Sequence, residues 1–269
     1  ASSAVSGCDI NVVPVWKNYS TYNKYKGDII VSIVDGGIDY KHEDLVDNMW
    51  RNPDKTGENV YGYNFVTDSY VIVPEDHGTH VAGIIANYTL ENVKIKPYKV
   101  LNREGKGSLS SIALALDMAV LDGADVVNIS IAGKAESPTL TASVDNATAN
   151  DVNVVVAAGN NSLNLKNNYI SPACIESAIT VSAIDANDNL ASFSNYNGTI
   201  DIAAPGVDIE SSYLNNTYIQ LSGTSMAAPQ VAAGIALLQS LKLNVSASEC
   251  ETQIKDYAIK VKEETGKNY

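Results

Sequence analysis

The sequence predicts an α/β protein in which helices flank a mainly parallel central sheet. Short apolar runs alternate with helical patterns along the chain, and this alternation indicates βαβ units. The runs are nearly continuous in Val and Ile, as expected for strands that are covered on both faces. No repeat or Pro/Gly-rich linker divides the 269 residues, so we expect one domain over residues 1–269.

The expected elements can be placed in chain order. Strands are expected at residues 29–34, 93–100, 126–131, 152–158 and 179–183, and helices at 80–87, 109–121 and 139–150. A mostly apolar helix is expected at 224–242, and a last amphipathic helix begins after Ser246 or Ser248 as its cap. Irregular segments concentrate at 48–76, 160–172 and 192–223. In an open α/β sheet ligands bind outside the carboxyl ends of the strands, so chemistry is expected in the loops that leave those ends.

The charge of the chain limits its partners. There are 18 Lys and Arg residues against 31 Asp and Glu residues, which gives a formal net charge of −13. Nucleic acid and anionic membranes would be repelled over most of the surface, whereas a neutral or basic peptide suits this charge. No run approaches the roughly 20 apolar residues that a membrane span needs, so we expect no membrane partner.

Three cysteines, Cys8, Cys174 and Cys250, lie far apart and lack the paired spacing of a zinc or redox site. Their odd number allows one disulfide and one free thiol, and the spacing alone does not select the pair. Several Asn-x-Ser/Thr triplets would accept glycans in a eukaryotic secretory pathway. They include those at Asn18, Asn87, Asn146, Asn197, Asn215 and Asn244.

Asp35 lies where a buried apolar strand gives way to glycines, in Ile-Val-Asp-Gly-Gly-Ile-Asp at residues 33–39. Asp and Gly are common turn formers, so this segment alone favours a simple strand-ending turn. The alternative is an acid in a site of low dielectric constant, where it fixes the tautomer of a histidine and stabilises its cation.

The sequence around His77 indicates a catalytic site more specifically than the sequence around Asp35 does. His77 opens His-Gly-Thr-His-Val-Ala-Gly at residues 77–83, which holds two of the three histidines of the chain at the start of a helix of small residues. His77 and His80 have the spacing of a metal-binding pair, but no Glu or third His lies nearby to complete such a site. We expect His77 to act as a general base and His80 to pack structurally.

Ser225 and Asn160 complete the set of polar residues. Ser225 lies in the first turn of the apolar helix at 224–242, where unpaired N–H groups favour an oxyanion; alternatively, Thr224 or Ser225 is only a helix cap. Asn160 follows a buried strand, where its amide offers a second oxyanion donor or merely caps a turn. All four residues lie where a doubly wound sheet brings strand ends and helix starts together.

Four blocks of sequence resemble the signatures of the subtilisin-like serine proteases, or subtilases. They are Val-Asp-Gly-Gly-Ile-Asp (34–39), His-Gly-Thr-His-Val-Ala-Gly (77–83), Ala-Ala-Gly-Asn (157–160) and Gly-Thr-Ser-Met-Ala-Ala-Pro (223–229). The resemblance implies the subtilisin-like three-layer fold and a secreted serine endopeptidase that forms an acyl-enzyme on Ser225. Asp35, His77 and Ser225 would be the triad, and Asn160 would form the oxyanion hole with the Ser225 backbone N–H. The chemistry would require no cofactor.

The resemblance also implies how a substrate binds. An extended peptide would pair with two edge segments that contain Gly105 and Gly107 on one side and Ser130, Ile131 and Ala132 on the other. The primary pocket would be walled by residues 130–132 and by Ala157, Ala158 and Gly159, which are small and leave room for a sizeable side chain. The expected partners are a protein or peptide substrate and the protein's own propeptide. The enzyme is expected to be a monomer that is made as a zymogen.

Some positions depart from the family pattern. Gly36 stands where most members carry Ser, Thr or Asp, which should spare the triad but loosen the strand end. Asp44 matches a calcium-ligating Asp of the family, but the loop that supplies the other ligands is cut short after Asn87. Calcium at Asp44 is therefore less favoured than calcium in the acidic loops at 47–58 or 68–76. The family also suggests a Cys174–Cys250 disulfide. No propeptide and no closing strand after Lys260 are visible, so we expect a trimmed C-terminus.

Two rival functions keep this fold. The first is a catalytically inactive homologue that serves as a binding or regulatory protein, although the intact Asp35, His77, Asn160 and Ser225 argue against it. The second is a peptide ligase or macrocyclase, in which an amine outcompetes water at the acyl-enzyme. The triad by itself does not separate ligation from hydrolysis.

Overall fold

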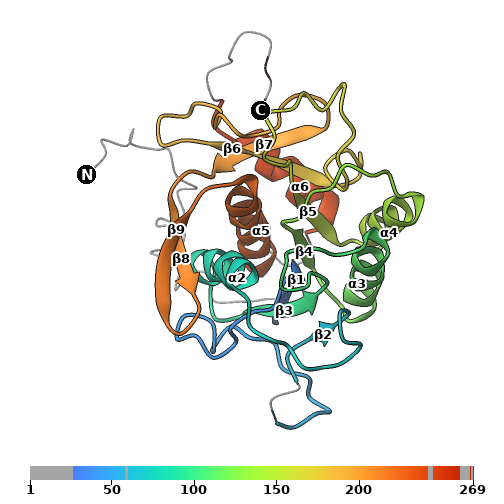
Figure 1. Cartoon of the computed structure of the whole chain (residues 1–269), viewed down its shortest axis with the longest axis vertical. Coiled ribbons are helices and arrows are strands. Elements are labelled where there is room, and N and C mark those ends of the chain that lie inside the picture. The colour runs from blue at the N-terminus through green and yellow to red at the C-terminus, as the bar shows by residue number, and fades with distance from the viewer. Residues whose placement is uncertain (1–26, 58–59, 242–244, 261–266, 268) are drawn as a thin grey trace.

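The computed structural model describes residues 27–57, 60–241, 245–260, 267 and 269 (Figure 1). Cys8, Asn18 and Asn244 lie outside these residues. Within them the chain forms three layers, with a sheet between two sets of helices, and this arrangement confirms the predicted fold class. None of the described helices has the length and apolar character needed to cross a membrane.

The middle layer is a seven-stranded sheet in the order β2-β3-β1-β4-β5-β6-β7, and all of its neighbouring strands pair in parallel. Its strands are β1 (Ile29–Asp35), β2 (Tyr63–Asn64), β3 (Val93–Lys99), β4 (Val126–Ile129), β5 (Asn153–Ala157), β6 (Ile179–Ile184) and β7 (Ile200–Pro205). The strand order reverses at β1, because β3 pairs with one of its edges and β4 with the other. Such a switch point opens a crevice at the carboxyl ends of the strands, and Asp35 ends β1 there.

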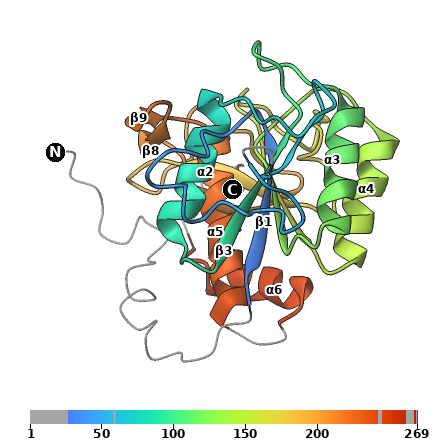
Figure 2. The same ribbon diagram turned by 90° about the horizontal axis from the view of Figure 1, so that it is seen from below.

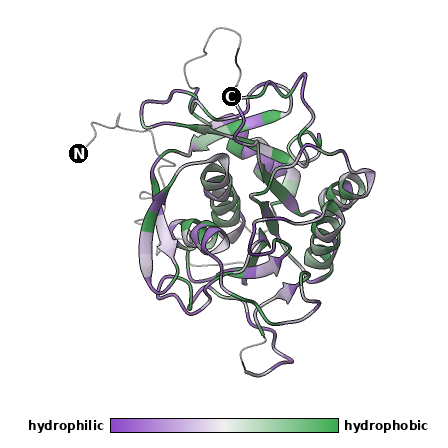
Figure 3. Cartoon of the chain, in the orientation of Figure 1, coloured by the Kyte–Doolittle hydropathy of each residue, from purple (hydrophilic) through white to green (hydrophobic). Residues whose placement is uncertain are grey.

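Helices cover both faces of the sheet, and Figure 2 shows them on either side of β1. They are α2 (Asp76–Tyr88), α3 (Leu109–Leu121), α4 (Pro138–Ala149), α5 (Thr224–Leu241) and α6 (Ala247–Tyr257). Helices α2 and α5 lie side by side on one face, and α3 and α4 lie on the other. Successive residues of β1 enter opposite cores: Ile33 packs with α2 and α5, whereas Val34 packs with α3 and α4. Hydrophobic residues accordingly gather in the centre of the sheet (Figure 3).

Most predicted elements lie close to their observed bounds, and α3 spans the residues expected for it. Helix α2 begins at Asp76, four residues earlier than expected, so His77 lies in its first turn. Ser246 caps α6 through a capping box, in which its side chain accepts from the Glu249 N–H and the Glu249 side chain accepts from the Ser246 N–H.

The irregular segment expected at 192–223 is wrong in part, because it contains β7 and a separate antiparallel hairpin. The hairpin pairs β8 (Ile209–Tyr213) with β9 (Thr217–Leu221). Its turn places Asn215 and Asn216 at φ values of 60° and 54°, a left-handed conformation that Asn tolerates well. Most residues of β9 are exposed, so this strand lacks the continuous apolar run that marked the buried strands.

The predicted Cys174–Cys250 disulfide is wrong, because both residues carry thiols. The Cys174 sulfur accepts a hydrogen bond from the Ile170 N–H at 3.3 Å, in a small apolar cluster below the loop that follows β5. Cys250 is fully buried on α6, in the core that contains α5. The two sulfurs therefore belong to different clusters. Among the described glycan triplets, Asn197 is buried, whereas Asn87, Asn146 and Asn215 are exposed and stay candidates.

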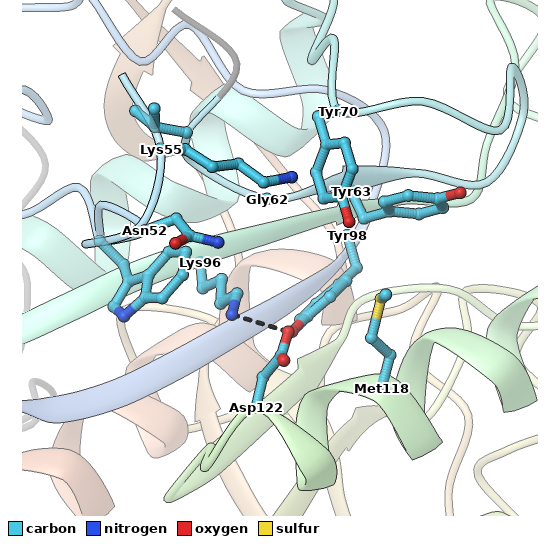
Figure 4. Close-up of a pocket in the computed structure, with 11 residues that line it drawn as sticks. Asn52, Lys55, Gly62, Tyr63, Tyr70, Lys96, Tyr98, Met118 and Asp122 are labelled. Atoms are coloured by element: carbon cyan, nitrogen blue, oxygen red, sulfur yellow. Dashed lines mark hydrogen bonds and ion pairs between the residues drawn. The ribbon is translucent and has the colours of Figure 1, made fainter. Parts of the chain in front are cut away.

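A cavity of about 80 Å³ lies beside β3, lined by the rings of Trp50, Tyr70 and Tyr98 among others (Figure 4). The Lys96 ammonium lies 3.5 Å from the centre of the Trp50 ring and 2.7 Å from an Asp122 carboxylate oxygen. The Tyr98 hydroxyl donates to the same carboxylate oxygen at 2.6 Å. Burial lowers the pKa of Lys96 below its ordinary value, and the Asp122 contact opposes this effect. Lys96, Tyr98 and Asp122 thus satisfy one another, as in a structural cluster.

The cluster gives a stability prediction. Asp122→Ala should leave the buried Lys96 ammonium without its ion partner and lower the free energy of unfolding by about 2 kcal/mol, less than for a fully buried pair because Asp122 is 37% exposed. Lys96→Met in the same background should recover part of this loss, because it removes the stranded charge. Urea denaturation measures both changes. Additive losses in the double variant would contradict the coupling.

Candidate active site

The Asp35 carboxylate and the His77 imidazole form one half of the site. His77 Nδ1 lies 2.8 Å from Asp35 Oδ1 and 3.0 Å from Oδ2. The carboxylate is fully buried and also accepts the Gly36 N–H at 2.6 Å. An ionised carboxylate only accepts hydrogen bonds, so the proton lies on Nδ1 and the imidazole presents an unprotonated Nε2. The His77 side chain is 37% exposed, so this Nε2 is accessible to a reacting group.

Glycines allow α2 to approach the end of β1. A Cβ added at Gly78 would lie 2.5 Å from the Gly37 carbonyl oxygen, and one added at Gly37 would lie 1.5 Å from the Val73 oxygen. A side chain at Gly78 would therefore push the first turn of α2 away from the strand end, and one at Gly37 would displace the segment that leads into α2. This backbone contact places His77 within reach of Asp35.

The expected loosening at Gly36 is offset by a neighbouring carboxylate. A Cβ at Gly36 would lie 2.7 Å from Glu75 Oε2, so Glu75 fills the space that a side chain would take. Glu75 forms a 2.5 Å ion pair with Lys99, which lies level with Asp35 on β3 and is buried. Lys99 also donates to the Leu101 carbonyl oxygen. The strand end is thus braced by an ion pair that the sequence patterns did not reveal.

Ser225 and Ser130 form the second half of the site. The Ser225 hydroxyl donates to the Ser130 carbonyl oxygen at 3.1 Å, and the Ser130 hydroxyl donates to the Ser225 carbonyl oxygen at 3.0 Å. The second bond has a clear cause, because Pro229 lies four residues after Ser225 in α5 and has no N–H to offer that carbonyl. Ser130 therefore ties the start of α5 to the end of β4.

The strand register brings the two halves together. Ile33 of β1 is paired with Asn128 of β4, so Asp35 and Ser130 lie level with one another two residues further along. Neighbouring strands are about 4.8 Å apart. Asp35 bonds His77 and Ser130 bonds Ser225, so both side chains are attached at the carboxyl ends of neighbouring strands. A hydrogen bond from the Ser225 hydroxyl to His77 is a prediction, since such catalytic bonds often form only when substrate is bound.

Asn160 is held by its amide oxygen at the start of α5. Its Oδ1 accepts hydrogen bonds from the Thr224 N–H at 2.8 Å and the Thr224 hydroxyl at 2.9 Å. The oxygen is thus occupied, and the NH₂ group is directed elsewhere. Asn160 Nδ2 and the Ser225 nitrogen lie 3.2 Å and 3.7 Å from the point where a Cβ at Gly223 would be. The two nitrogen atoms that are expected to donate to an oxyanion therefore lie near the same point beside Gly223.

The comparisons agree with this geometry. A family model described as the subtilase family matches residues 26–268. The chain belongs to the subtilase family. It is 39% identical over 245 residues to Subtilisin DY of Bacillus licheniformis, covering 87% of this chain and 85% of that one. It is also 39% identical over 238 residues to a thermophilic serine proteinase of Bacillus sp. (strain AK1), covering 82% of this chain but only 56% of that longer protein.

A solved structure shows the same likeness. The crystal structure of a cold adapted subtilisin-like serine proteinase matches this subtilase with a TM-score of 0.76 and 28% sequence identity. The match covers 87% of this chain and 85% of that chain. The predicted family and the predicted fold class are therefore confirmed together, whereas the role of each site residue stays a prediction.

The other two histidines of this subtilase, His80 and His42, contact main-chain carbonyl groups of the β8–β9 hairpin. His80 Nε2 lies 3.1 Å from the Ile219 carbonyl oxygen, and His42 Nε2 lies 3.2 Å from the Thr217 carbonyl oxygen. Both rings are fully buried, and burial lowers the pKa of His80. His80 therefore turns toward β9, which leaves no metal pair with His77.

The expected calcium ligand also contacts the hairpin. Asp44 Oδ2 accepts the Ser212 hydroxyl at 2.8 Å, and Oδ1 accepts the Tyr218 hydroxyl at 3.1 Å. Across the described residues no three His, Cys, Asp or Glu side chains come together as a metal-binding group. A calcium site at Asp44 or in the acidic loops therefore stays a prediction, and Asp44 has a structural role that the sequence did not suggest.

The expected substrate-binding residues lie on both sides of the Asp35 strand. Gly105 and Gly107 belong to an exposed turn that follows β3, and Ile131 and Ala132 follow β4. Strands β3 and β4 are the two neighbours of β1. The two segments therefore leave the strands on either side of β1, while Ala157, Ala158 and Gly159 lie at the end of β5, one strand beyond β4.

The pair of Asp35 and His77 predicts the pH dependence of activity. The Asp35 charge raises the pKa of His77 above its ordinary value of about 6.5, although burial opposes this effect. The imidazolium cannot accept a proton, so kcat/KM should fall as the pH drops through a midpoint above 6.5. In Asp35→Asn the midpoint should move down, with kcat reduced by about 10⁴-fold.

A pH profile of kcat/KM on a peptide substrate measures this midpoint. Asp145→Asn is a matched control, because Asp145 lies on α4, on the opposite face of the sheet. It should leave the midpoint unchanged. An equal midpoint in wild type and in Asp35→Asn would contradict the assigned role of Asp35.

Proposed function

We propose that this subtilase cleaves internal peptide bonds through an acyl-enzyme on Ser225, with Asp35 and His77 as the other members of the triad. The relatives that it matches are named subtilisin and serine proteinase, and the enzyme is accordingly a serine endopeptidase. The proposal is carried by the bond of the buried Asp35 carboxylate to His77 at the same sheet edge that holds Ser225.

The first chemical step joins Ser225 to the substrate. As the Ser225 oxygen attacks the scissile carbonyl carbon, His77 Nε2 takes the hydroxyl proton. The imidazolium that forms is stabilised by the buried Asp35 carboxylate, which stays ionised. His77 then gives this proton to the leaving amine nitrogen, so the peptide bond breaks and the acyl group stays on Ser225.

The carbonyl oxygen carries the negative charge of the tetrahedral intermediate. Asn160 Nδ2 and the Ser225 N–H are the two donors beside it, and the start of α5 adds the positive end of the helix dipole. Removal of such an Asn donor in a subtilisin lowers kcat about 10²- to 10³-fold. In the last step His77 takes a proton from water as the water oxygen attacks the acyl carbon. The ester bond to Ser225 then breaks, His77 returns the proton to the Ser225 oxygen, and the second product leaves as a carboxylic acid.

The substrate is proposed to bind as an extended strand over the end of β1. The turn at residues 103–108 is exposed, and so is Ala132 on the opposite side. Main-chain groups of these two segments suit an inserted peptide, because an added strand needs only an open edge on either side. The net charge of −13 favours neutral or basic peptides.

Covalent labelling tests the nucleophile. A fluorophosphonate should label folded wild type at Ser225, while Ser225→Ala should remain unlabelled and lose peptide cleavage. Ser222→Ala is a matched control, because Ser222 precedes α5 and bonds Asp208 instead; it should keep both labelling and cleavage.

The same experiment addresses the rivals. Folded wild type without an adduct would favour an inactive binding homologue. Mass spectrometry of the products in the presence of an added amine separates hydrolysis from ligation, because a ligase would give the amide instead of the free carboxylate.

We propose a preference for small side chains before the cleaved bond, in place of the sizeable side chain that the small wall residues alone suggested. A Cβ placed at Gly159 would lie only 3.5 Å from the Ala132 methyl carbon. A methyl group added at Gly159 would thus just contact Ala132, so the gap between Gly159 and Ala132 accommodates little more than one methyl group. We propose that Ala132 restricts the pocket.

Substrate pairs test this restriction. Ala132→Gly should raise the ratio of kcat/KM for Phe over Ala at the position before the cleaved bond by at least about 10-fold, since a methyl group in a pocket is worth about that factor. Ala135→Gly makes the same change in the same exposed loop and should leave the ratio unchanged. Equal ratios in both variants would exclude Ala132 as the restricting residue.

Secretion, a propeptide and glycans belong to the same proposal. A secreted protease fits the surface charge, and the exposed triplets at Asn87, Asn146 and Asn215 are accessible to glycosylation in a eukaryotic host. The propeptide is expected to be a second peptide partner of the substrate crevice.

A further inference from the structure

Asn195 stands out among the described residues that the proposed mechanism does not use. It is fully buried, yet its side chain makes all of its hydrogen bonds to the loop that carries Asn160. Its Nδ2 donates to the Ala158 carbonyl oxygen at 2.7 Å. Its Oδ1 accepts the Asn161 N–H at 3.2 Å and the Leu163 N–H at 2.9 Å. One side chain thus holds the main chain on both sides of Asn160.

The backbone of Asn195 adds a fourth contact, because its N–H donates to the Gly159 carbonyl oxygen at 2.9 Å. Gly159 has a φ of 99°, a conformation that side chains rarely adopt. A Cβ at Gly159 would also lie 2.6 Å from Asn195 Nδ2. The close approach of Asn195 and the turn at Gly159 therefore require each other.

Thr224, at the start of α5, also forms hydrogen bonds to the loop that carries Asn160. The Thr224 hydroxyl accepts the Gly159 N–H at 3.0 Å and donates to Asn160 Oδ1 at 2.9 Å. Asn195 and Thr224 thus fix the main chain and the side chain of Asn160 respectively. Asn160 itself is exposed, so packing alone does not hold its amide in place.

We propose that Asn195 is the positioning residue of the oxyanion hole. By holding the main chain at Ala158, Gly159 and Asn161, it fixes the direction in which the Asn160 amide donates to the oxyanion. Oxyanion donors act through preorganisation, so a small displacement costs transition-state binding more than substrate binding. This inference rests on the proposed function of Asn160 and deepens it.

The inference predicts a specific kinetic pattern. Asn195→Ala should lower kcat about 10-fold per folded molecule, less than loss of the Asn160 amide itself, while KM changes by less than about twofold. Asn195→Ser keeps a short donor and should fall between wild type and Asn195→Ala. A peptide boronic acid, whose tetrahedral adduct places an oxygen in the oxyanion hole, should lose affinity in proportion to kcat.

A double-mutant cycle separates positioning from general structural damage. In an Asn160→Ala background the donor is absent, so adding Asn195→Ala should lower kcat by less than about twofold. Folded protein is quantified by circular dichroism before kinetics, at a temperature below the melting transition of every variant. If Asn195→Ala does not fold, the same cycle is run with Asn195→Ser.

Asn48→Ala is the matched control. The Asn48 amide also ties down a loop, because it donates to the Leu90 and Val93 carbonyl oxygens at 3.1 Å and 2.9 Å. Val93 begins β3, so this contact lies at the edge of the sheet opposite to Asp35. Asn48→Ala should lower the melting temperature and leave kcat and the boronate affinity unchanged.

Three results would overturn the proposal for Asn195: an unchanged kcat in the folded variants, a change confined to KM, or equal effects of Asn195→Ala with and without the Asn160 amide. Failure of the proposed function is distinct, because wild type and Asn48→Ala would then fail to cleave peptides as well.

Discussion

The hydrogen bonds between the Asp35 carboxylate and His77 are the interaction on which the rest of the site depends. They join the end of β1 to the first turn of α2, and they engage Nδ1 of the imidazole, which leaves Nε2 for the proposed reaction. The backbones approach closely here, because the glycines at 37 and 78 carry no side chain that would keep them apart. The buried pair of Glu75 and Lys99 then braces the same strand end.

The other half of the site depends on the register of the sheet strands. β1, β4 and β5 are neighbours in the sheet, so their carboxyl ends deliver Asp35, Ser130 and the loop before Asn160 to one edge. Helix α5 enters from one face and is attached to both strands, through Ser130 to β4 and through Thr224 to the loop after β5. The candidate catalytic residues are thereby held at one edge of the sheet by direct contacts between distant parts of the sequence.

The sequence predicted the buried elements more accurately than the exposed ones. Elements with continuous apolar runs or strong caps, such as α3 and the Ser246 cap of α6, were placed closely. The hairpin of β8 and β9 was missed because its residues are largely exposed and its contacts to His42, His80 and Asp44 come from distant segments. The disulfide expectation failed because the positions of Cys174 and Cys250 in separate clusters depend on the tertiary fold.

By itself the sequence determined the fold class, the family and the four polar residues at strand ends and helix starts, because periodicity and local motifs encode them. Only the tertiary structure decided how these residues are held. The Ser130 bond to a carbonyl that Pro229 leaves unpaired, the Glu75 carboxylate beside Gly36 and the grip of Asn195 on both sides of Asn160 all join residues far apart in the chain. Such contacts leave no local pattern, since they arise from the meeting of separate elements in space.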